Sequence, residues 1–305
     1  MSKTAEPTPG RIHDRRRGAR RRPPVWFLLP ALAIYAFTVL WPTGRGAVYA
    51  FTDWDGLSAV FNWVGFANFK AVFTTSVSTA ALRNTLIFAV AIMILQNVFG
   101  LLLALALNTR VKSRSVLRTI YFAPVILTPL VTGYTWDFLL QPNGTVNTVL
   151  RAIGLGQFAQ NWLGDPRFAL GAVIVAYLWQ FSGMSMVIYL AGLQAVPPEL
   201  MDAAVVDGAG PVRRFFSVTL PLINGAFVIN GLLTMVSGMG QFDQVYAMTK
   251  GGPIHATETI STVIYSEGFQ LGRVAFGSAL ALVMAVVVAI LAITQFRLSS
   301  RRVEL

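Results

Sequence analysis

Six apolar stretches, each long enough to cross a lipid bilayer as a helix, constrain the fold of this chain most strongly. A helix rises about 1.5 Å per residue, so about 20 apolar residues span the hydrocarbon core. The stretches of that length are 25–44, 84–107, 117–139, 168–193, 220–242 and 274–296. Only 12% of the 305 residues are charged, whereas soluble domains carry about 25%. The sequence therefore predicts an all-α membrane protein with six transmembrane helices, formed by one domain over residues 25–298.

The distribution of basic residues predicts the orientation of these spans. Seven arginines lie between Arg11 and Arg22, just before the first apolar stretch. A basic arm also occurs in nucleic-acid-binding proteins, but this position is typical of a cytoplasmic flank, and the same arginines suit anionic lipid headgroups. With the N-terminus in the cytoplasm, 17 lysines and arginines fall on the cytoplasmic side and 7 on the outer side. We therefore expect two cytoplasmic tails, 1–24 and 299–305, and no nucleic-acid partner.

The first stretch also has the arginine-rich start of a signal peptide. No small-residue cleavage site follows it directly, and the apolar run continues through Trp41, which is longer than a typical signal core. We therefore expect a retained span.

The predicted outer connections are 45–83, 140–167 and 243–273. They contain Trp54, Trp63 and Trp162, which suit an aromatic belt at the membrane interface. Apolar residues at 260, 263 and 264 predict a short amphipathic helix on the outer membrane surface.

Catalytic and metal-binding groups are scarce in this sequence. It contains no cysteine and only two histidines, His13 and His255, so it has neither a thiolate nor a histidine-rich metal site. It also has no glycine-rich phosphate loop ending in Gly-Lys-Ser/Thr, so we expect no nucleotide site. Asp137 is the only acidic residue in or beside a predicted span, and it lies near the outer end. We expect a non-enzymatic protein that binds no cofactor or metal.

Besides an enzyme, a secondary transporter or channel is an alternative class for a membrane protein of this kind. Such folds often contain inverted repeats and charges at the membrane midplane, and neither is evident here.

The predicted cytoplasmic loop 194–221 contains more structural signals than a plain connector. Pro197-Pro198 suits the first turn of a helix, where the missing N–H costs nothing. Asp202 favours the positive end of that helix. Gly208 and Gly210 then end the helix and turn the chain before a second short helix. An ordinary amphipathic connector is the simpler alternative, but the helix–turn–helix pattern favours a docking surface for another protein.

This loop resembles the EAA loop of permease subunits of binding-protein-dependent ABC importers. The pattern is Asp202-Ala203-Ala204, then Asp207-Gly208-Ala209, then Leu220-Pro221. The resemblance implies the type I ABC importer permease fold, with a coupling helix that lies in a groove of the ATPase subunit. Asp202 stands where the family has glutamate, which shortens the side chain by one methylene.

Further segments resemble the carbohydrate branch of that family, and in particular its maltose-type first permease subunit. They are Gly65–Phe69, Arg83–Leu86, Gly100–Asn108, Arg118–Pro124, Phe242–Thr249, Gly251–Pro253 and Ala256–Thr259. The resemblance implies a multi-pass subunit of the bacterial inner membrane that imports a sugar, either a disaccharide or an oligosaccharide. A polyol or a glycerol phosphate ester is the alternative substrate. The implied partners are a second permease subunit, two ATPase subunits that bind ATP and Mg, and an extracytoplasmic substrate-binding protein.

The spans on either side of the loop are expected to contact the sugar, as the family implies. The candidate residues on the fourth span follow helical spacing, and those on the fifth do the same. They are Tyr177, Gln180, Phe181 and Met184 on the fourth span, and Thr234, Gly238 and Gln241 on the fifth. The amides and hydroxyl suit sugar hydroxyls, the rings suit sugar C–H groups, and the glycine leaves room for a ring. The alternative is that these polar groups bond only between helices.

Overall fold

The computed structural model describes residues 25–109 and 112–300, so most of the predicted tails 1–24 and 299–305 lie outside the described residues. The chain divides into two compact units, residues 1–45 and 46–305. The described part of the first unit contains η1 (Val25–Leu28), α1 (Leu29–Tyr35) and the π-helical η2 (Ala36–Leu40). The next helix, α2 (Trp41–Tyr49), begins in the first unit and ends in the second. The first predicted span is thus a succession of short helical segments.

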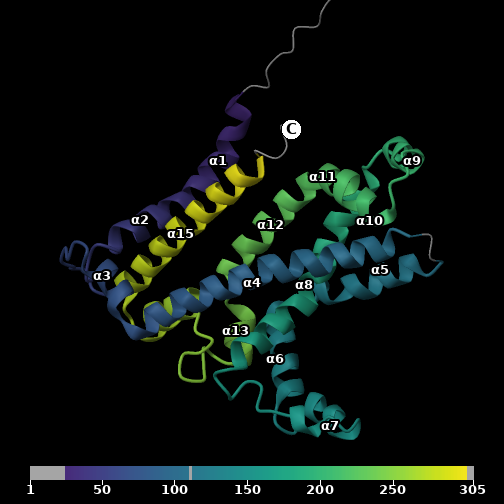
Figure 1. Cartoon of the computed structure of the whole chain (residues 1–305). Helices are drawn as coiled ribbons and strands as arrows, with labels where there is room; N and C mark the ends of the chain where they lie inside the picture. The colour runs from purple at the N-terminus through teal and green to yellow at the C-terminus, as the bar shows by residue number, and fades with distance from the viewer. Residues whose placement is uncertain (1–24, 110–111, 301–305) are drawn as a thin grey trace, which may run out of the picture. The chain divides into compact units, whose positions relative to one another are not determined.

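Three helices of the second unit are long and apolar enough to cross a membrane. They are α4 (Ser76–Leu107), α8 (Ala169–Gln194) and α15 (Val274–Ser300), which match the second, fourth and sixth predicted stretches. Helices α4 and α8 lie side by side in Figure 1 and share a core that includes Ala104 and Tyr189. The all-α prediction is confirmed for the described residues, where the only strand-like pairing is an isolated bridge between Thr52 and Trp63.

The third predicted stretch is a broken helix, not one continuous span. It contains α5 (Arg114–Phe122), η3 (Ala123–Ile126) and α6 (Pro129–Leu140), and a further helix, α7 (Thr145–Ala152), follows. The segments before and after the break at Leu127 and Thr128 meet at 98°. Both break residues are extended, with ψ of 144° and 140°. The ring of Pro129 disfavours helical geometry in Thr128, the residue directly before it.

The fifth predicted stretch, 220–242, is also bent, and its helix ends before the predicted boundary. The chain bends by 68° at Ile223, and the helix beyond it, α12, covers Asn224–Met239. The sequence had suggested that Gln241 lies on one face of this helix, but Gln241 follows the end of the helix. By length and composition, the described chain contains three membrane-crossing helices, or up to five if each bent pair is one span. The count of six therefore stays a prediction.

Short helices and loops form the predicted outer side. They are α3 (Ala67–Thr74), η4 (Gly156–Phe158), α13 (Asp243–Met248), α14 (Ile260–Tyr265) and the π-helical η6 (Ser266–Gln270). The predicted amphipathic helix is present as α14, but its apolar residues Ile260 and Val263 are buried in a core with α15. The prediction that this helix lies on the membrane surface was therefore wrong, because its apolar face packs against protein.

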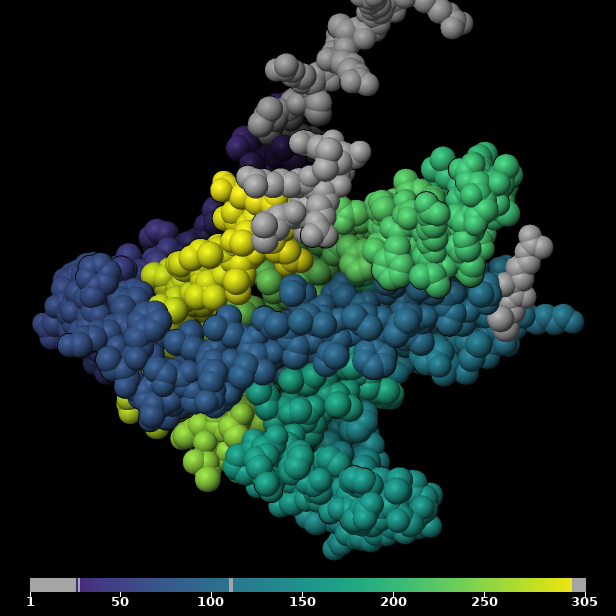
Figure 2. Space-filling view, viewed as in Figure 1, coloured from purple at the N-terminus to yellow at the C-terminus, as the bar shows by residue number. Residues whose placement is uncertain are grey.

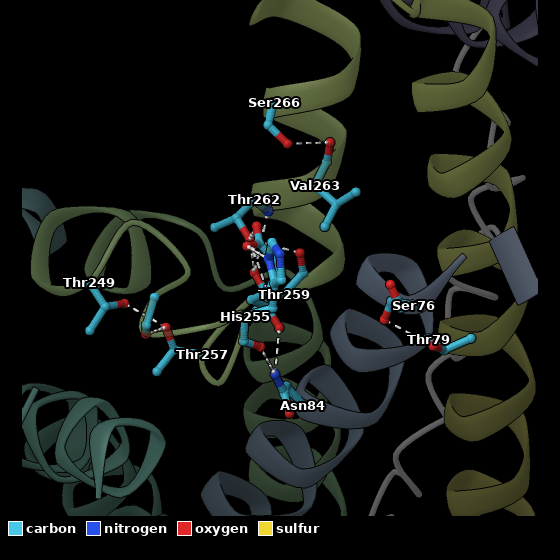
Figure 3. A network of polar contacts seen from close by, with 12 residues as sticks. Ser76, Thr79, Asn84, Thr249, His255, Thr257, Thr259, Thr262, Val263 and Ser266 are labelled. Atoms are coloured by element: carbon cyan, nitrogen blue, oxygen red, sulfur yellow. Dashed lines mark hydrogen bonds and ion pairs between the residues drawn. The ribbon is translucent and has the colours of Figure 1, made fainter. Parts of the chain in front are cut away.

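Polar contacts hold the loop before α14 to α4, as Figure 3 shows. The Asn84 side chain donates hydrogen bonds to the backbone oxygens of His255 and Glu258, at 3.0 and 3.1 Å. The Thr85 hydroxyl accepts one from the Ile260 N–H at 2.9 Å. A segment distant in the sequence is thereby fixed to the N-terminal half of α4.

We predict that fusions at the C-terminus and in the 140–167 connection report opposite sides of the membrane. The excess of basic residues on one side provides the physical reason. A reporter active only in the periplasm should be inactive after Leu305 and active within 140–167, and a cytoplasmic reporter should give the reverse. Periplasmic activity at the C-terminus contradicts this topology.

Candidate functional site

The predicted coupling loop is a helix–turn–helix. Its first helix, α9 (Pro198–Val206), begins after Pro197, and Asp207 ends it. Gly208 then adopts a left-handed φ of +73°, which is the conformation that glycine adopts most readily. The second arm runs without interruption through α10 (Pro211–Arg214), the π-helical η5 (Phe215–Thr219) and α11 (Leu220–Leu222). The helix boundaries expected from the prolines and glycines are thus confirmed.

The loop exposes both apolar and acidic side chains. Val206 is 87% exposed, Val212 is 70% exposed and Phe216 is 60% exposed. Asp202 and Asp207 are exposed beside them. In Figure 2 this green segment forms a projecting lobe at one end of the second unit. Exposed apolar residues that lie among charged residues are typical of a protein-docking surface.

The base of α9 faces the ends of the long helices across a small cavity. A cavity of about 280 Å³ separates them and is lined by Asn108, Leu193, Val196, Pro198, Met201, Asp202 and Thr219. These residues come from the loop and from the C-terminal ends of α4 and α8.

A larger cavity of about 390 Å³ lies among α4, α8, α12 and the broken helix. Its lining residues are Gln96, Val125, Tyr177, Phe181, Met184, Ile188, Asn230, Leu233, Thr234, Ser237 and Gln241. Five of the seven predicted pathway residues belong to this lining, namely Tyr177, Phe181, Met184, Thr234 and Gln241. The rings of Tyr177 and Phe181 pack at 4.6 Å between centroids.

Gln180 does not line this cavity, although it was predicted to contact the sugar. Its side chain is fully buried. Its Nε2 donates to the Leu127 carbonyl oxygen at 2.7 Å, and its Oε1 accepts from Gln244. Leu127 lies at the break of the third predicted stretch, where carbonyls lose their helical partners. Gln180 thus satisfies a backbone group at the break and connects it to α13.

Gly238 also lies away from the cavity, where α12 crosses α4. A Cβ at Gly238 would lie 2.9 Å from the Cα of Ala89 and 3.4 Å from its Cβ. The glycine therefore allows close packing of two helices, which differs from the predicted role of making room for a sugar ring.

A buried polar network joins α4, α8 and α12 beside the cavity. Asn97 Oδ1 accepts hydrogen bonds from the Tyr189 hydroxyl and from Asn230 Nδ2, and Asn97 Nδ2 donates to the Thr234 hydroxyl at 3.1 Å. Ser185 donates to Asn230 Oδ1 at 3.0 Å. The predicted site omitted Gln96, Asn230 and Ser237. The sequence did contain a signal for Gln96, because Gln96 and Asn97 are the only strongly polar residues in 86–107.

Among the described residues, no charged side chain lines this cavity. Its polar groups are amides and hydroxyls, and its remaining surface is aromatic and aliphatic. Such a lining suits a neutral, hydroxylated ligand better than an anion, because an unpaired charge in a low-dielectric site is costly.

Comparisons with known proteins define the family. Residues 96–304 match the model of the binding-protein-dependent transport system inner membrane component. The multiple sugar-binding transport system permease protein MsmF of Streptococcus mutans is 30% identical over 275 residues, which cover 90% of this chain and 94% of MsmF. The sn-glycerol-3-phosphate transport system permease protein UgpA of Yersinia pestis is 31% identical, over 92% of this chain and 95% of UgpA.

A solved structure shares the fold. A bacterial ABC transporter involved in the import of the acidic polysaccharide alginate has a chain that superposes with a TM-score of 0.78 at 24% sequence identity. The match covers 91% of this chain and 96% of that one. The chain belongs to the family of binding-protein-dependent transport system inner membrane components. It is a multi-pass inner-membrane protein with the permease fold implied by its loop.

Proposed function

We propose that this chain is the first permease subunit of an ATP-driven importer for a neutral disaccharide or oligosaccharide. The cavity among α4, α8 and α12 forms the sugar passage, and an extracytoplasmic binding protein delivers the sugar to it. The observation that carries the proposal is the charge-free lining, which combines aromatic rings with amides and hydroxyls. Aromatic walls with a few placed polar groups are typical of small-molecule sites.

The charge-free lining of the cavity also argues against a glycerol phosphate ester as the substrate. Relatives include a glycerol phosphate system as well as sugar systems. A phosphate ester carries one to two negative charges, and proteins usually bind phosphate with arginine, lysine or a helix N-terminus. No lysine or arginine of the part of the chain that the structure describes lines this cavity, so a neutral sugar fits it better than sn-glycerol 3-phosphate.

The coupling loop connects this passage to ATP hydrolysis in partner subunits. A second permease subunit completes the membrane part, and two ATPase subunits bind ATP and Mg. Their closure moves α9, and the residues around the small cavity at its base transmit the movement to the ends of α4 and α8. The loop's exposed apolar residues, with Asp202 and Asp207 beside them, support a docked ATPase subunit. Transport follows alternating access, in which each ligand shifts the balance between inward-facing and outward-facing states.

A competition experiment tests the substrate class. The co-encoded binding protein is screened against maltose, raffinose, diacetylchitobiose and sn-glycerol 3-phosphate. We expect it to retain a neutral sugar, and we expect a 100-fold excess of the phosphate ester to leave uptake of that sugar unchanged. Retention and import of the phosphate ester alone contradict the proposal.

A cavity variant tests the passage. We expect Phe181→Ala to raise the KM for uptake by roughly tenfold, because about 1.4 kcal/mol of ring contact is lost. Trp179→Ala is the matched control, since Trp179 lies on the same helix, is 45% exposed and does not line the cavity. Equal KM values for the two variants at equal membrane abundance place the passage elsewhere.

A further inference from the structure

A cavity of about 510 Å³ lies beside the first turns of α8, at the end of that helix farther from the coupling loop. Its walls come from α6, α7, α8 and the loop before α8. The lining residues are Trp136, Leu140, Val146, Trp162, Arg167, Phe168, Gly171, Ala172 and Val175. None of these nine residues lines the proposed sugar passage. Leu140 and Ala172 also belong to a buried core, so part of the wall is fixed by packing.

This cavity and the passage lie on opposite faces of α8. Val175 lines the first and Tyr177 lines the second, and two residues turn an α-helix by about 200°. The face away from the passage is exposed at Gly171, Val175 and Trp179, which follow one another at intervals of four. Because α8 is long and apolar enough to cross a membrane, this exposed stripe has the character of a lipid-facing surface, and it leads into the cavity.

The wall of the cavity is almost entirely apolar. Among the described residues, Arg167 is the only charged residue in the lining. The Trp162 indole N–H already donates to Asn147 Oδ1 at 2.8 Å. A sugar buried here would lose the hydrogen bonds of its hydroxyl groups to water without regaining them, and water itself finds few partners in such a cavity. The lining therefore selects for hydrocarbon.

The size of the cavity argues against a helix of a partner subunit as its occupant. A helix about 10 Å wide that rises about 5.4 Å per turn fills about 400 Å³ per turn. The cavity of about 510 Å³ thus has room for little more than one turn. A flexible acyl chain can follow an irregular wall, and its approach along α8 is open, because a Cβ on Gly171 would meet no atom within 4 Å.

An ion pair at the rim suits a phospholipid headgroup. Arg167 donates from Nε and from Nη2 to the Asp165 carboxylate, with an Nη2–Oδ2 distance of 2.6 Å. These hydrogen bonds lower the pKa of Asp165 to about 2, so its carboxylate is ionised at neutral pH. The Arg167 side chain is 79% exposed, and its Nη1 donates to no group of the described chain. Nη1 can therefore bind a phosphate, whereas the Asp165 charge disfavours a head with a net negative charge.

We propose that this cavity binds one phospholipid of the surrounding bilayer, with an acyl chain between α6, α7 and α8 and the phosphate on Arg167. Phosphatidylethanolamine is the favoured lipid, because its head carries a phosphate but no net charge. The bound chain completes the packing of the second half of the broken helix against α8. The site is separate from the sugar passage and does not depend on which substrate the complex carries.

Photo-crosslinking in nanodiscs tests the site. The complete complex is reconstituted with phosphatidylethanolamine that carries a diazirine in one acyl chain, and labelled residues are mapped by mass spectrometry. The label should appear on residues that line the cavity, such as Trp136 and Val175. Gly171→Phe should reduce this labelling roughly fivefold, because a ring and an acyl chain cannot share a close-packed space. Val187→Phe is the matched control, since Val187 is also exposed on α8 and does not line the cavity, and its labelling should equal that of wild type.

A diacylglycerol with the same diazirine chain tests the headgroup contact. It lacks the phosphate, so it should label the cavity of wild-type complex roughly fivefold less than phosphatidylethanolamine does, the loss of one charge-assisted contact. Arg167→Gln should be labelled equally by the two probes. Unlabelled phosphatidylethanolamine should compete with the probe more strongly than unlabelled phosphatidylglycerol.

Three results would overturn the proposal: no label on the lining residues of wild-type complex, undiminished labelling of Gly171→Phe, or equal labelling of wild type by the two probes. A photoreactive benzoylphenylalanine in place of Gly171 identifies what covers the cavity. Its cross-link to lipid supports the proposal, and its cross-link to a partner permease or to the binding protein contradicts it. The measurement needs no sugar, so its failure is distinct from a failure of the proposed function.

Discussion

Substituting Gly183 with alanine should nearly abolish the folded subunit in the membrane. A Cβ at this position would overlap the Tyr121 carbonyl oxygen and lie 2.9 Å from the Phe122 Cα. Both are backbone atoms of α5, so the clash is relieved only if a whole helix shifts. Overpacking of this kind costs about 1–3 kcal/mol and sometimes more, a large share of a typical stability of about 5–15 kcal/mol. We expect membrane abundance to fall at least tenfold.

Gly171→Ala provides the control on the same helix. Gly171 also belongs to α8, but a Cβ there would meet no atom within 4 Å. Alanine is favoured over glycine in a helix by up to about 1 kcal/mol, so abundance should be unchanged or slightly higher. The abundance of the two variants is compared by quantitative immunoblots of membranes, and their stability by the thermal midpoints of the purified complexes. Similar abundance of the two variants means that α5 does not pack against α8 as described.

The second large effect is expected at the turn of the coupling loop, where Gly208→Val should uncouple ATP hydrolysis from transport. The left-handed backbone at Gly208 costs a non-glycine residue about 1–2 kcal/mol, and more when the side chain is β-branched. No atom lies within 4 Å of the added Cβ, so the strain acts on the turn and not on the core. The direction of α9 relative to α10 should change. We expect uptake to fall at least tenfold while membrane abundance stays within twofold of wild type.

Gly210→Ala is the control for this variant. Gly210 has a φ of −67°, which alanine adopts without strain, and a Cβ there also meets no atom within 4 Å. Uptake and sugar-stimulated ATPase activity are measured for both variants in the assembled complex. Normal uptake by Gly208→Val at normal abundance contradicts a coupling role for this turn.

Local signals made the coupling loop and the long spans predictable from sequence. Pro198 and Gly208 act within a few residues of themselves, so their effect on the helix boundaries does not depend on distant contacts. The apolar runs that became α4, α8 and α15 are equally local, because length and hydrophobicity alone identify them. Helical spacing also brought Tyr177, Phe181 and Met184 to the same cavity.

The remaining features depend on contacts between distant segments. Gln180 has the spacing of a cavity residue, but the Leu127 carbonyl freed by the break before Pro129 binds its amide. Gly238 has the spacing of a pocket residue, but Ala89 of another helix occupies the space beside it. Periodicity shows which face of a helix a residue occupies, but not whether that face meets a cavity or a neighbouring backbone.

The most direct test of the account is sugar accumulation by the reconstituted complex. Proteoliposomes contain this chain with its partner permease and ATPase subunits, ATP is enclosed on the ATPase side, and the sugar-loaded binding protein is added on the other. The account predicts accumulation against the concentration gradient that requires both ATP and the binding protein, and that is lost when this chain is omitted. Equal sugar flux without ATP, or full accumulation by a complex that lacks this chain, would contradict it.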